Sequence, residues 1–200
     1  IASRGDLPIP LKYYAAHTSR WGGMDKVNLQ NLPSRGPNAG TLKKAIRAPD
    51  GYVMIDSDSS QIEARMLAWM AGQDDLVEAF RNKEDVYKIM ASAIYGIPVE
   101  DITPAQRFIG KTVILGSGYG LGGKKFFVFM KAAGVAMTQD MASHIIDTYR
   151  FTYPTIPKLW EKGDTLLRAI IDNQTAPYGK GGVVKLAWGV IHTPIGLPMK

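Results

Sequence analysis

Apolar side chains recur at three- and four-residue spacing through most of residues 61–173, a pattern that is typical of amphipathic helices. Glycine or proline interrupts the pattern at intervals, as expected where helices end. Gly72 and Gly96 each follow a periodic stretch, and Thr103-Pro104 offers an N-cap followed by a proline at the first helical position. These signals predict helices at residues 61–71, 74–80, 85–95, 103–115, 124–133, 139–152 and 156–173.

The segments on either side of this helical region have different patterns. Residues 1–50 are rich in glycine, asparagine and proline, which predicts mostly irregular structure with short turns. Residues 52–55 form an apolar run that ends in aspartates, and this run predicts a strand. Residues 181–194 alternate apolar and polar positions like a pair of strands. The predicted fold class is therefore α+β, with a helical subdomain inserted into a sheet domain.

Composition narrows the class of protein only a little. The 200 residues suffice for one large domain or two small ones. Lysine plus arginine number 24 against 18 acids, and the net charge of +6 favours a polyanionic partner such as nucleic acid. A basic protein without such a partner would have the same charge. The absence of cysteine excludes a disulfide framework and a thiolate metal site.

The sequence contains neither a signal-peptide pattern nor an apolar run of the roughly 18 residues that span a bilayer. We therefore expect a cytoplasmic protein without a membrane partner. The chain starts without methionine and stops directly after a strand-like segment. From these ends we expect it to be a piece of a longer protein.

The stretch from Arg107 to Gly120 carries the first group of candidate residues. Arg107 and Lys111 are four residues apart on a predicted helix, so their side chains lie on one face, about one turn apart. Two such cations can bind neighbouring phosphates of a polyphosphate, arginine in a bidentate manner and lysine as a point charge. Tyr119 could then offer its ring to a base. The alternative is an ordinary solvated basic face.

The end of the predicted strand carries the second group. Asp58 stands where the strand gives way to a helix, and Asp56 points to the same face because it is two residues earlier. Carboxylates at such a junction, with backbone carbonyls nearby, can hold a hard cation such as Mg²⁺. Glu63 follows in the first turns of the helix. The alternatives are a solvated or helix-capping aspartate and, for Glu63, an acid that complements the helix dipole.

Together these stretches resemble family A DNA polymerases. The first palm motif of that family, D-x-S-Q-I-E-x-R, is matched by "DSSQIEAR" at residues 58–65. The fingers motif, R-x3-K-x3-aromatic-G-x2-Y-G, is matched about 50 residues later at residues 107–120. A third element, T-x-R followed by N-L-Q-N-x-P, is similar to residues 18–33. The resemblance covers essentially the whole chain and looks closest to bacteriophage members.

The resemblance implies a template-directed DNA polymerase that transfers deoxynucleotidyl groups from dNTPs to a primer 3′-hydroxyl in DNA replication. Arg107 and Lys111 would hold the triphosphate and neutralise charge on the leaving group, with Lys111 as a candidate proton donor. Glu63 would exclude a ribose 2′-hydroxyl. The implied nucleotide-binding residues are Ser60, Gln61, Glu63, Tyr87, Arg107, Lys111, Leu115 and Tyr119.

The resemblance also implies a metal site and DNA contacts. Asp58 would be one of two carboxylates that bind two Mg²⁺ ions, helped by the Ser59 carbonyl, and such ions clamp the attacking and leaving oxygens of an in-line displacement. The second carboxylate motif, His-Asp-Glu in the family, is absent and is expected beyond residue 200. Gly120, with Tyr119, would shape the pocket of the templating base. The implied contacts to the primer–template minor groove are Arg20, Asn28, Gln30 and Asn31.

Three departures from the family pattern bear on function. Leu115 stands where most members have Phe or Tyr, which leaves sugar discrimination open. Tyr87 stands where many members have His. Without the second carboxylate motif, this segment alone is expected to be inactive. Asp56 shares a strand with Asp58 rather than facing it, so we do not expect it to replace the missing ligand.

The expected organisation is part of a right-hand polymerase. Residues 1–60 would be the N-terminal part of the palm with the first catalytic motif, and residues 61–182 the helical fingers, inserted into an antiparallel palm sheet. Residues 183–200 would be strands that return to the palm. The protein is expected to act as a monomer on primer–template DNA in the cytoplasm of a bacterium or a phage-infected host.

Two other functions fit part of the sequence. A single-subunit RNA polymerase shares the aspartate and the R-x3-K arrangement, but Glu63 argues against it because a bulky acid there should exclude ribonucleotides. A catalytically inactive DNA-binding module is permitted by the missing carboxylate motif. Competing dNTP and rNTP incorporation would decide the first alternative, and the sequence downstream of Lys200 would decide the second.

Overall fold

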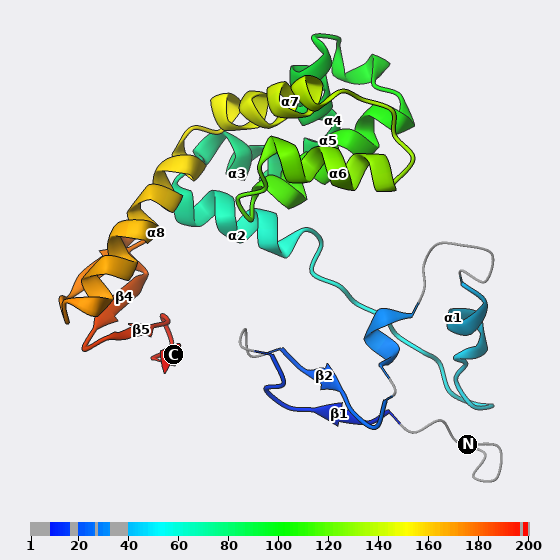
Figure 1. The fold of residues 1–200 in the computed structure, drawn as a ribbon. Coiled ribbons are helices and arrows are strands. Elements are labelled where there is room, and N and C mark those ends of the chain that lie inside the picture. The colour runs from blue at the N-terminus through cyan, green and yellow to red at the C-terminus, as the bar shows by residue number, and fades with distance from the viewer. Residues whose placement is uncertain (1–8, 17–19, 27, 33–39, 197, 200) are drawn as a thin grey trace. The chain divides into compact units, whose positions relative to one another are not determined.

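The computed structural model of the protein describes residues 9–16, 20–26, 28–32, 40–196 and 198–199. The chain divides into two compact units, Ile1–Asp58 and Ser59–Lys200, each with its own internal contacts (Figure 1). No helix in the described residues is long and apolar enough to cross a membrane.

The first unit contains little regular structure, as predicted for residues 1–50. Two strands of two residues each pair antiparallel, with Leu11 opposite Gly23 and Lys12 opposite Gly22. Its described elements are β1 (Leu11–Lys12), β2 (Gly22–Gly23), the 3₁₀ helix η1 (Leu29–Asn31) and α1 (Thr41–Ala45). None of these was predicted individually, because such short elements carry too little periodicity to be recognised.

The strand predicted at residues 52–55 is wrong. These residues have neither strand nor helix structure, and their apolar side chains are 60% to 86% exposed. A strand is stabilised by hydrogen bonds to a neighbouring strand, and none of the described strands pairs with this run. The β propensity of the run is therefore not sufficient to make it a strand here.

All the predicted helices are confirmed in the second unit, with ends that differ from the prediction by at most two residues. They are α2 (Ile62–Ala71), α3 (Asp74–Arg81), α4 (Val86–Tyr95), α5 (Pro104–Ser117), α6 (Gly123–Ala132), α7 (Gln139–Thr152) and α8 (Thr155–Ile171). The short 3₁₀ helices η2 (Val99–Asp101) and η3 (Lys180–Gly182) were not predicted. The fold is mostly helical α+β.

Local signals explain where several helices begin and end. At the start of α5, Thr103 Oγ1 accepts a hydrogen bond from the Gln106 N–H at 3.3 Å. In return, Gln106 Oε1 accepts one from the Thr103 N–H at 2.9 Å, which completes a capping box. Gly72 and Gly96 end α2 and α4 in the left-handed conformation that glycine adopts without steric cost.

The main core of the second unit lies among helices α2 to α7 and the start of α8, and its closest approach is between α4 and α5. A Cβ atom on Gly110 of α5 would lie 2.1 Å from the carbonyl oxygen of Tyr87 and 3.1 Å from the backbone nitrogen of Ala91. Only glycine allows the two backbones to come this near. The largest fully buried side chains around this contact and in the rest of the core are Met90, Phe126, Met130, Ile146, Tyr149 and Ile156.

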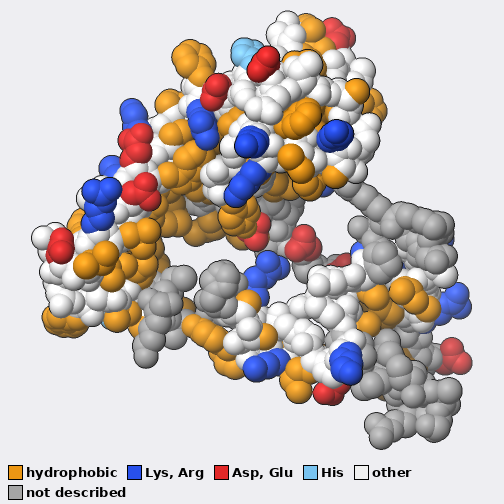
Figure 2. Space-filling view, in the orientation of Figure 1, with side chains coloured by type: hydrophobic (Ala, Val, Ile, Leu, Met, Phe, Trp, Pro, Cys, Tyr) orange, Lys and Arg blue, Asp and Glu red, His pale blue; other side chains and the backbone are white. Residues whose placement is uncertain are grey.

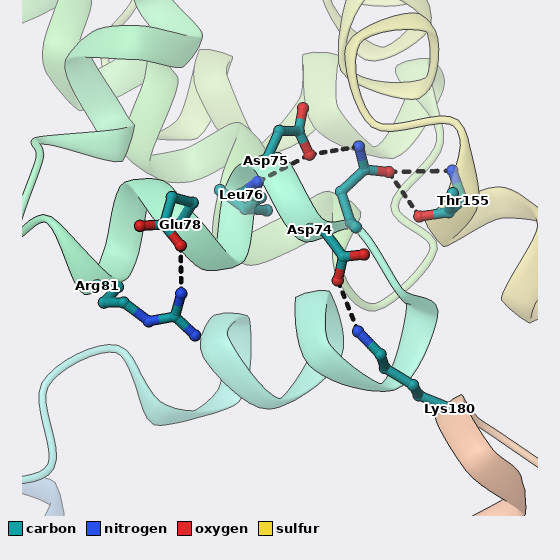
Figure 3. A network of polar contacts seen from close by, with 8 residues as sticks. Asp74, Asp75, Leu76, Glu78, Arg81, Thr155 and Lys180 are labelled. Atoms are coloured by element: carbon teal, nitrogen blue, oxygen red, sulfur yellow. Dashed lines mark hydrogen bonds and ion pairs between the residues drawn. The ribbon is translucent and has the colours of Figure 1, made fainter.

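A buried glutamine, Gln73, joins the start of α8 to the turn between α2 and α3. Figure 3 labels its partners Asp75 and Thr155. The side chain of Gln73 is 7% exposed. Its Oε1 accepts hydrogen bonds from the backbone N–H and the hydroxyl of Thr155 at 3.1 and 2.6 Å, and its Nε2 donates to Asp75 at 2.7 Å. Lys180 donates to Asp74 at 2.7 Å and ties the segment after α8 to α3. Because a buried amide without partners is costly, these bonds hold the start of α8 in place.

Helix α8 leads into an antiparallel sheet whose four described strands are adjacent in chain order. They are β3 (Ala176–Tyr178), β4 (Val184–Ala187), β5 (Val190–His192) and β6 (Pro198–Met199). The strand pair predicted in residues 181–194 is confirmed by β4 and β5. Trp188 and Gly189 connect them with φ angles of +51° and +72°, as a two-residue type I′ turn requires. The Tyr178 hydroxyl donates to the Leu159 carbonyl at 3.0 Å, which attaches the sheet to α8.

Replacing Gly110 with alanine should lower the melting temperature more than replacing Gly116, although both glycines lie in α5. A Cβ on Gly110 would meet the α4 backbone, whereas one on Gly116 would meet the movable end of Leu121 at 2.6 Å. Overpacking costs about 1–3 kcal/mol, which is about 2–12 °C in a chain of this size. We expect a loss in that range for Gly110→Ala and a smaller one for Gly116→Ala, measured by circular dichroism. Equal losses would contradict the importance of the α4–α5 approach.

Candidate functional site

Arg107 and Lys111 lie on one face of α5, above Tyr87 of α4. The centroid of the Tyr87 ring is 5.1 Å from Arg107 Cζ and 5.9 Å from Lys111 Nζ. Tyr87 is only 6% exposed, whereas Arg107 is half-buried and Lys111 is exposed. The structure therefore brings these three predicted residues together, with both cations over an aromatic face that attracts positive charge.

Asp85 binds Arg107 and caps α4 with the same carboxylate. Its Oδ2 accepts a hydrogen bond from Arg107 Nε at 2.6 Å, and its Oδ1 accepts the backbone N–H groups of Tyr87 and Lys88, both at 3.2 Å. Partial burial raises the pKa of Asp85. The hydrogen bond from Arg107, the two backbone hydrogen bonds and the charge of Arg107 outweigh burial and hold that pKa below the ordinary 3.8.

The sequence patterns did not place Asp85 in the site. Asp85 was predicted as the first residue of a helix, and in the structure it is the N-cap of α4. Its bond to Arg107 joins positions 22 residues apart, and it depends on how α4 and α5 pack. No pattern within the sequence of either helix reports that contact.

A second set of predicted residues lines a hollow between α2 and the end of α5. Glu63 comes from α2, Leu115 from the last turn of α5, and Tyr119 from the turn that follows. The hollow has a volume of about 280 Å³, and its other lining residues are Ala64, Met66, Leu67, Met70, Ile114 and Gly118. Glu63 is thus the one charged residue among the residues that line this hollow in the described structure.

Glycines shape the end of α5 beside this hollow. A Cβ on Gly118 would lie 3.0 Å from Cδ2 of Leu67, so glycine lets the end of α5 approach α2 closely. Gly120 has a φ of +74°, in the left-handed region that favours glycine. The turn between these glycines carries Tyr119, which is 75% exposed. The ring is therefore accessible to a ligand at the mouth of the hollow.

The Asp58 motif spans the boundary between the two units. Asp58 is the last residue of the first unit, and Ser59 is the first residue of the second. The Ser59 carbonyl accepts a hydrogen bond from the Ile62 N–H at 3.3 Å. Gln61 directly precedes α2, with a φ of +57°. Ser60, Gln61 and Glu63 therefore belong to the unit that contains α5, whereas Asp58 belongs to the other.

The residues around Asp58 do not form a complete cation site by themselves. Asp58 and Asp56 are exposed and offer carboxylate oxygens, the donor type that Mg²⁺ prefers. However, no group of three or more histidine, aspartate or glutamate side chains in the described residues could hold a metal ion. A Mg²⁺ ion at Asp58 would need further ligands.

The predicted DNA-binding residues of the first unit are close together along the chain and exposed. Asn28 Oδ1 accepts a hydrogen bond from the Gln30 N–H at 3.0 Å and thereby caps η1, which ends at Asn31. Arg20 lies just before β2, and its carbonyl accepts two backbone N–H groups of the preceding turn. Motif positions 18, 19 and 33 lie outside the described residues.

On the face of the molecule shown in Figure 2, basic side chains are interspersed with acidic and hydrophobic ones rather than gathered in one stripe. The net charge of +6 therefore does not by itself mark a binding surface on that face. The placement of Arg107 and Lys111 on one face of α5 indicates a binding site more specifically than the net charge does.

Comparison with known proteins decides the family. Residues 12–170 match the family described as "DNA polymerase family A". The DNA polymerase I of Pseudomonas aeruginosa is 35% identical over 147 residues, which is 74% of this chain and 15% of that protein. This chain belongs to DNA polymerase family A.

Other family A polymerases agree with this assignment. The thermostable DNA polymerase I of Thermus aquaticus is 30% identical over 158 residues, covering 79% of this chain and 18% of that protein. A solved structure, "POL domain of Pol1 from M. smegmatis complex with DNA primer-template and dNTP", matches with a TM-score of 0.66 and 26% identity. It covers 86% of this chain and 29% of the solved chain. The chain thus spans less than a fifth of the length of these curated relatives.

The predicted membership of family A is confirmed by these matches. The finer likeness to bacteriophage members is not supported by them, because the relatives named here are bacterial enzymes. The roles of individual residues remain predictions, since the matches establish the family and not the function of each side chain.

We expect Asp85→Asn to lower the melting temperature near neutral pH and to have less effect in acid. The pKa of Asp85 is lower in the folded protein than its ordinary 3.8. Its charge therefore stabilises the fold above about pH 3.8, and this contribution is lost as the pH falls through the lower, folded pKa. Thermal melts from pH 7 to pH 2.5 should show the difference from the unchanged chain shrinking below about pH 4.

The neighbouring Glu84 provides a control for this prediction, because its side chain accepts a hydrogen bond from Asn82 instead of Arg107. Glu84→Gln should shift the melting temperature little across the same pH range. A difference between Asp85→Asn and the unchanged chain that stays constant from pH 7 to pH 2.5 would contradict a stabilising charge at Asp85.

Proposed function

We propose that this chain is the nucleotide-binding part of a template-directed DNA polymerase, which transfers deoxynucleotidyl groups from dNTPs to a primer 3′-hydroxyl. The observation that supports this most is the arrangement along α5. Arg107 and Lys111 share one face of the helix over Tyr87, and Leu115 lines the hollow at the end of the same helix. One helix therefore presents the two cations along its first two turns and the apolar hollow at its C-terminal end.

Arg107 and Lys111 would bind the triphosphate. The guanidinium of Arg107 has five N–H donors, and the four on its two Nη atoms remain for phosphate oxygens when Nε is bound to Asp85. Lys111 adds a point charge one turn further along the helix. Both would neutralise charge that develops on the leaving pyrophosphate, and Lys111 is the candidate proton donor.

The hollow beside Leu115 would receive the sugar of the incoming nucleotide, with Tyr119 and Gly120 next to the templating base. Glu63 at its wall would penalise a ribose 2′-hydroxyl by a clash or by an unpaired polar group. Leu115 provides no hydroxyl and no ring, so sugar recognition would depend on shape and on Glu63. Ser60 and Gln61, at the start of α2, would border this nucleotide site.

The organisation proposed around this site is that of a right-hand polymerase. Residues 1–60 would be the start of the palm, residues 61–182 the fingers, and residues 183–200 strands that return to an antiparallel palm sheet. Arg20, Asn28, Gln30 and Asn31 would contact the minor groove of the primer–template. The M. smegmatis neighbour was solved with primer–template and dNTP, which supports the same partners here. The protein would act as a monomer in the cytoplasm.

Mg²⁺ would be held by Asp58 and the Ser59 carbonyl together with a carboxylate from outside the described residues. Bound ions of this kind activate the attacking hydroxyl and stabilise the leaving phosphates. Since the described residues contain no complete site, we expect the 200-residue chain alone to be inactive in primer extension.

Replacing Arg107 or Lys111 with alanine should impair nucleotide use far more than DNA binding. Each change removes a charge-assisted contact to phosphate, and such contacts are worth about 1.5–3 kcal/mol, or about 10- to 150-fold. In the polymerase that contains this segment, we expect kcat/KM for dNTPs to fall by at least about tenfold. Primer–template affinity should change by less than about threefold.

Lys125→Ala is a matched control for this experiment, because Lys125 is an exposed lysine on α6. It should change neither quantity appreciably. If Arg107→Ala and Lys111→Ala reduced DNA affinity and nucleotide use equally, the two cations would belong to a general DNA-binding face, and the proposed triphosphate site would be rejected.

Glu63→Ala should raise the use of rNTPs relative to dNTPs by at least about tenfold, a difference of about 1.4 kcal/mol. Shortening the side chain removes the penalty against the 2′-hydroxyl without adding a contact for dNTPs. The rNTP/dNTP ratio of kcat/KM in the polymerase that contains this segment is the measurement. The alternative is an acid that only complements the helix dipole, worth about 0.3–1 kcal/mol. In that case the melting temperature would fall slightly and the ratio would stay the same.

A further inference from the structure

Both cations of the proposed triphosphate site have neighbours on α4, although Lys111 is exposed. Arg107 is bound through Nε to Asp85 at 2.6 Å, and its Cζ lies 5.1 Å from the centre of the Tyr87 ring. Lys111 Nζ lies 5.9 Å from the same ring. Both supporting residues come from the first turn of α4 or its cap, so one short piece of backbone supports both cations.

The orientation of the Asp85 carboxylate is determined by the helix that it caps. One oxygen accepts the N–H groups of Tyr87 and Lys88, each at 3.2 Å, and this leaves the other oxygen for Arg107. Arginine otherwise has many rotamers, and a carboxylate held at two points restricts the guanidinium to few of them. The Arg107 guanidinium is thus anchored through Nε before any ligand binds, and its Nη atoms remain as donors.

The position of the Tyr87 ring is equally constrained. The residue is 6% exposed, so its ring cannot move without disturbing the core. Its carbonyl lies where a Cβ on Gly110 would be only 2.1 Å away, which means that α5 is seated directly on this residue. The ring therefore forms a rigid apolar support under Arg107 and Lys111, and its face attracts both charges.

We infer that Asp85 and Tyr87 are positioning residues, which preorganise Arg107 and Lys111 for a nucleoside triphosphate without touching it themselves. This inference rests on the proposed function, because it assumes that the two cations bind triphosphate. It assigns Tyr87 a different role from direct nucleotide contact: the buried ring supports the cations from below.

Asp85 also has an unfavourable effect on triphosphate binding, because its carboxylate repels the negative phosphates. The Asp85 charge is already compensated by Arg107 and by two amide groups at the N-terminus of α4, which reduces its repulsion of an anion. We therefore expect the restriction of the Arg107 side chain to outweigh the remaining repulsion. Removing the carboxylate should weaken triphosphate binding.

The test is binding of dATP with Mg²⁺ to the 200-residue chain, measured by isothermal titration calorimetry. Asp85→Ser is the informative variant, since serine retains the helix cap but is too short to hold Arg107. Tyr87→Leu removes the aromatic face and keeps an apolar side chain, whereas Tyr87→Phe keeps the ring and removes only the hydroxyl. Arg107→Ala is the reference for loss of the phosphate contact, and Glu84→Gln controls for the loss of a nearby negative charge.

We expect Asp85→Ser and Tyr87→Leu each to weaken dATP binding by about 2- to 12-fold, the range that corresponds to immobilising one long side chain. Tyr87→Phe and Glu84→Gln should stay within about twofold of the unchanged chain. The double variant Asp85→Ser/Arg107→Ala should bind no more weakly than Arg107→Ala alone, because Asp85 acts through Arg107. A purely structural role of Asp85 would instead give additive losses.

The possible results distinguish a failure of the positioning role from a failure of the proposed triphosphate site. If Arg107→Ala binds dATP as well as the unchanged chain, the proposed triphosphate site falls, and the inference falls with it. If Arg107→Ala binds weakly while Asp85→Ser and Tyr87→Leu bind normally or more tightly, the triphosphate site stands and the positioning role is rejected. Melting curves of all variants identify any loss of fold.

Discussion

The contact between Gly110 and the backbone of α4 is the constraint on which the site depends. Any side chain at position 110 would push α5 away from Tyr87, since even a Cβ would lie 2.1 Å from the Tyr87 carbonyl. At the observed approach, Arg107 and Lys111, three residues before and one residue after Gly110, lie over the Tyr87 ring. Asp85, at the cap of α4, comes within 2.6 Å of Arg107. The absence of a Cβ atom at position 110 thus determines which groups of α4 lie next to the cations of α5.

The helices could be predicted from the sequence because their signals are local. The Thr103 N-cap with Pro104 directly after it, and the glycines after α2 and α4, each act within a few residues of the helix end that they specify. The apolar run at residues 52–55 shows the limit of such reasoning. A strand needs a partner that can lie anywhere in the chain, and β propensity does not report whether one is present. The β4–β5 pair was predictable because its partner lies across a two-residue turn.

The candidate site likewise has some features with a local signal in the sequence and others without one. The spacing of Arg107 and Lys111 on one helix indicated a shared face, and their neighbourhood over Tyr87 agrees with it. The hollow that Glu63 shares with Leu115 depends on α2 packing beside the end of α5 and has no local signal. The family motifs marked both residues before the structure showed that they line one space. The Arg107–Asp85 bond was marked by neither the motifs nor the spacing, because it belongs to the packing of two helices.

Arg65, the last residue of the Asp58 motif, contacts the backbone of the protein itself. Arg65 donates from Nε to the Ser60 carbonyl at 2.9 Å and from Nη1 to the Phe80 carbonyl at 3.2 Å, and its Cζ lies 4.7 Å from the centre of the Phe80 ring. These contacts close the turn before α2 against the end of α3. Gln61, with a φ of +57°, lies inside that turn, in a conformation that is unfavourable without support from its surroundings. The arginine of the motif therefore holds the backbone from which Ser60, Gln61 and Glu63 extend, and a loss of function on its replacement would not by itself place it in contact with a nucleotide.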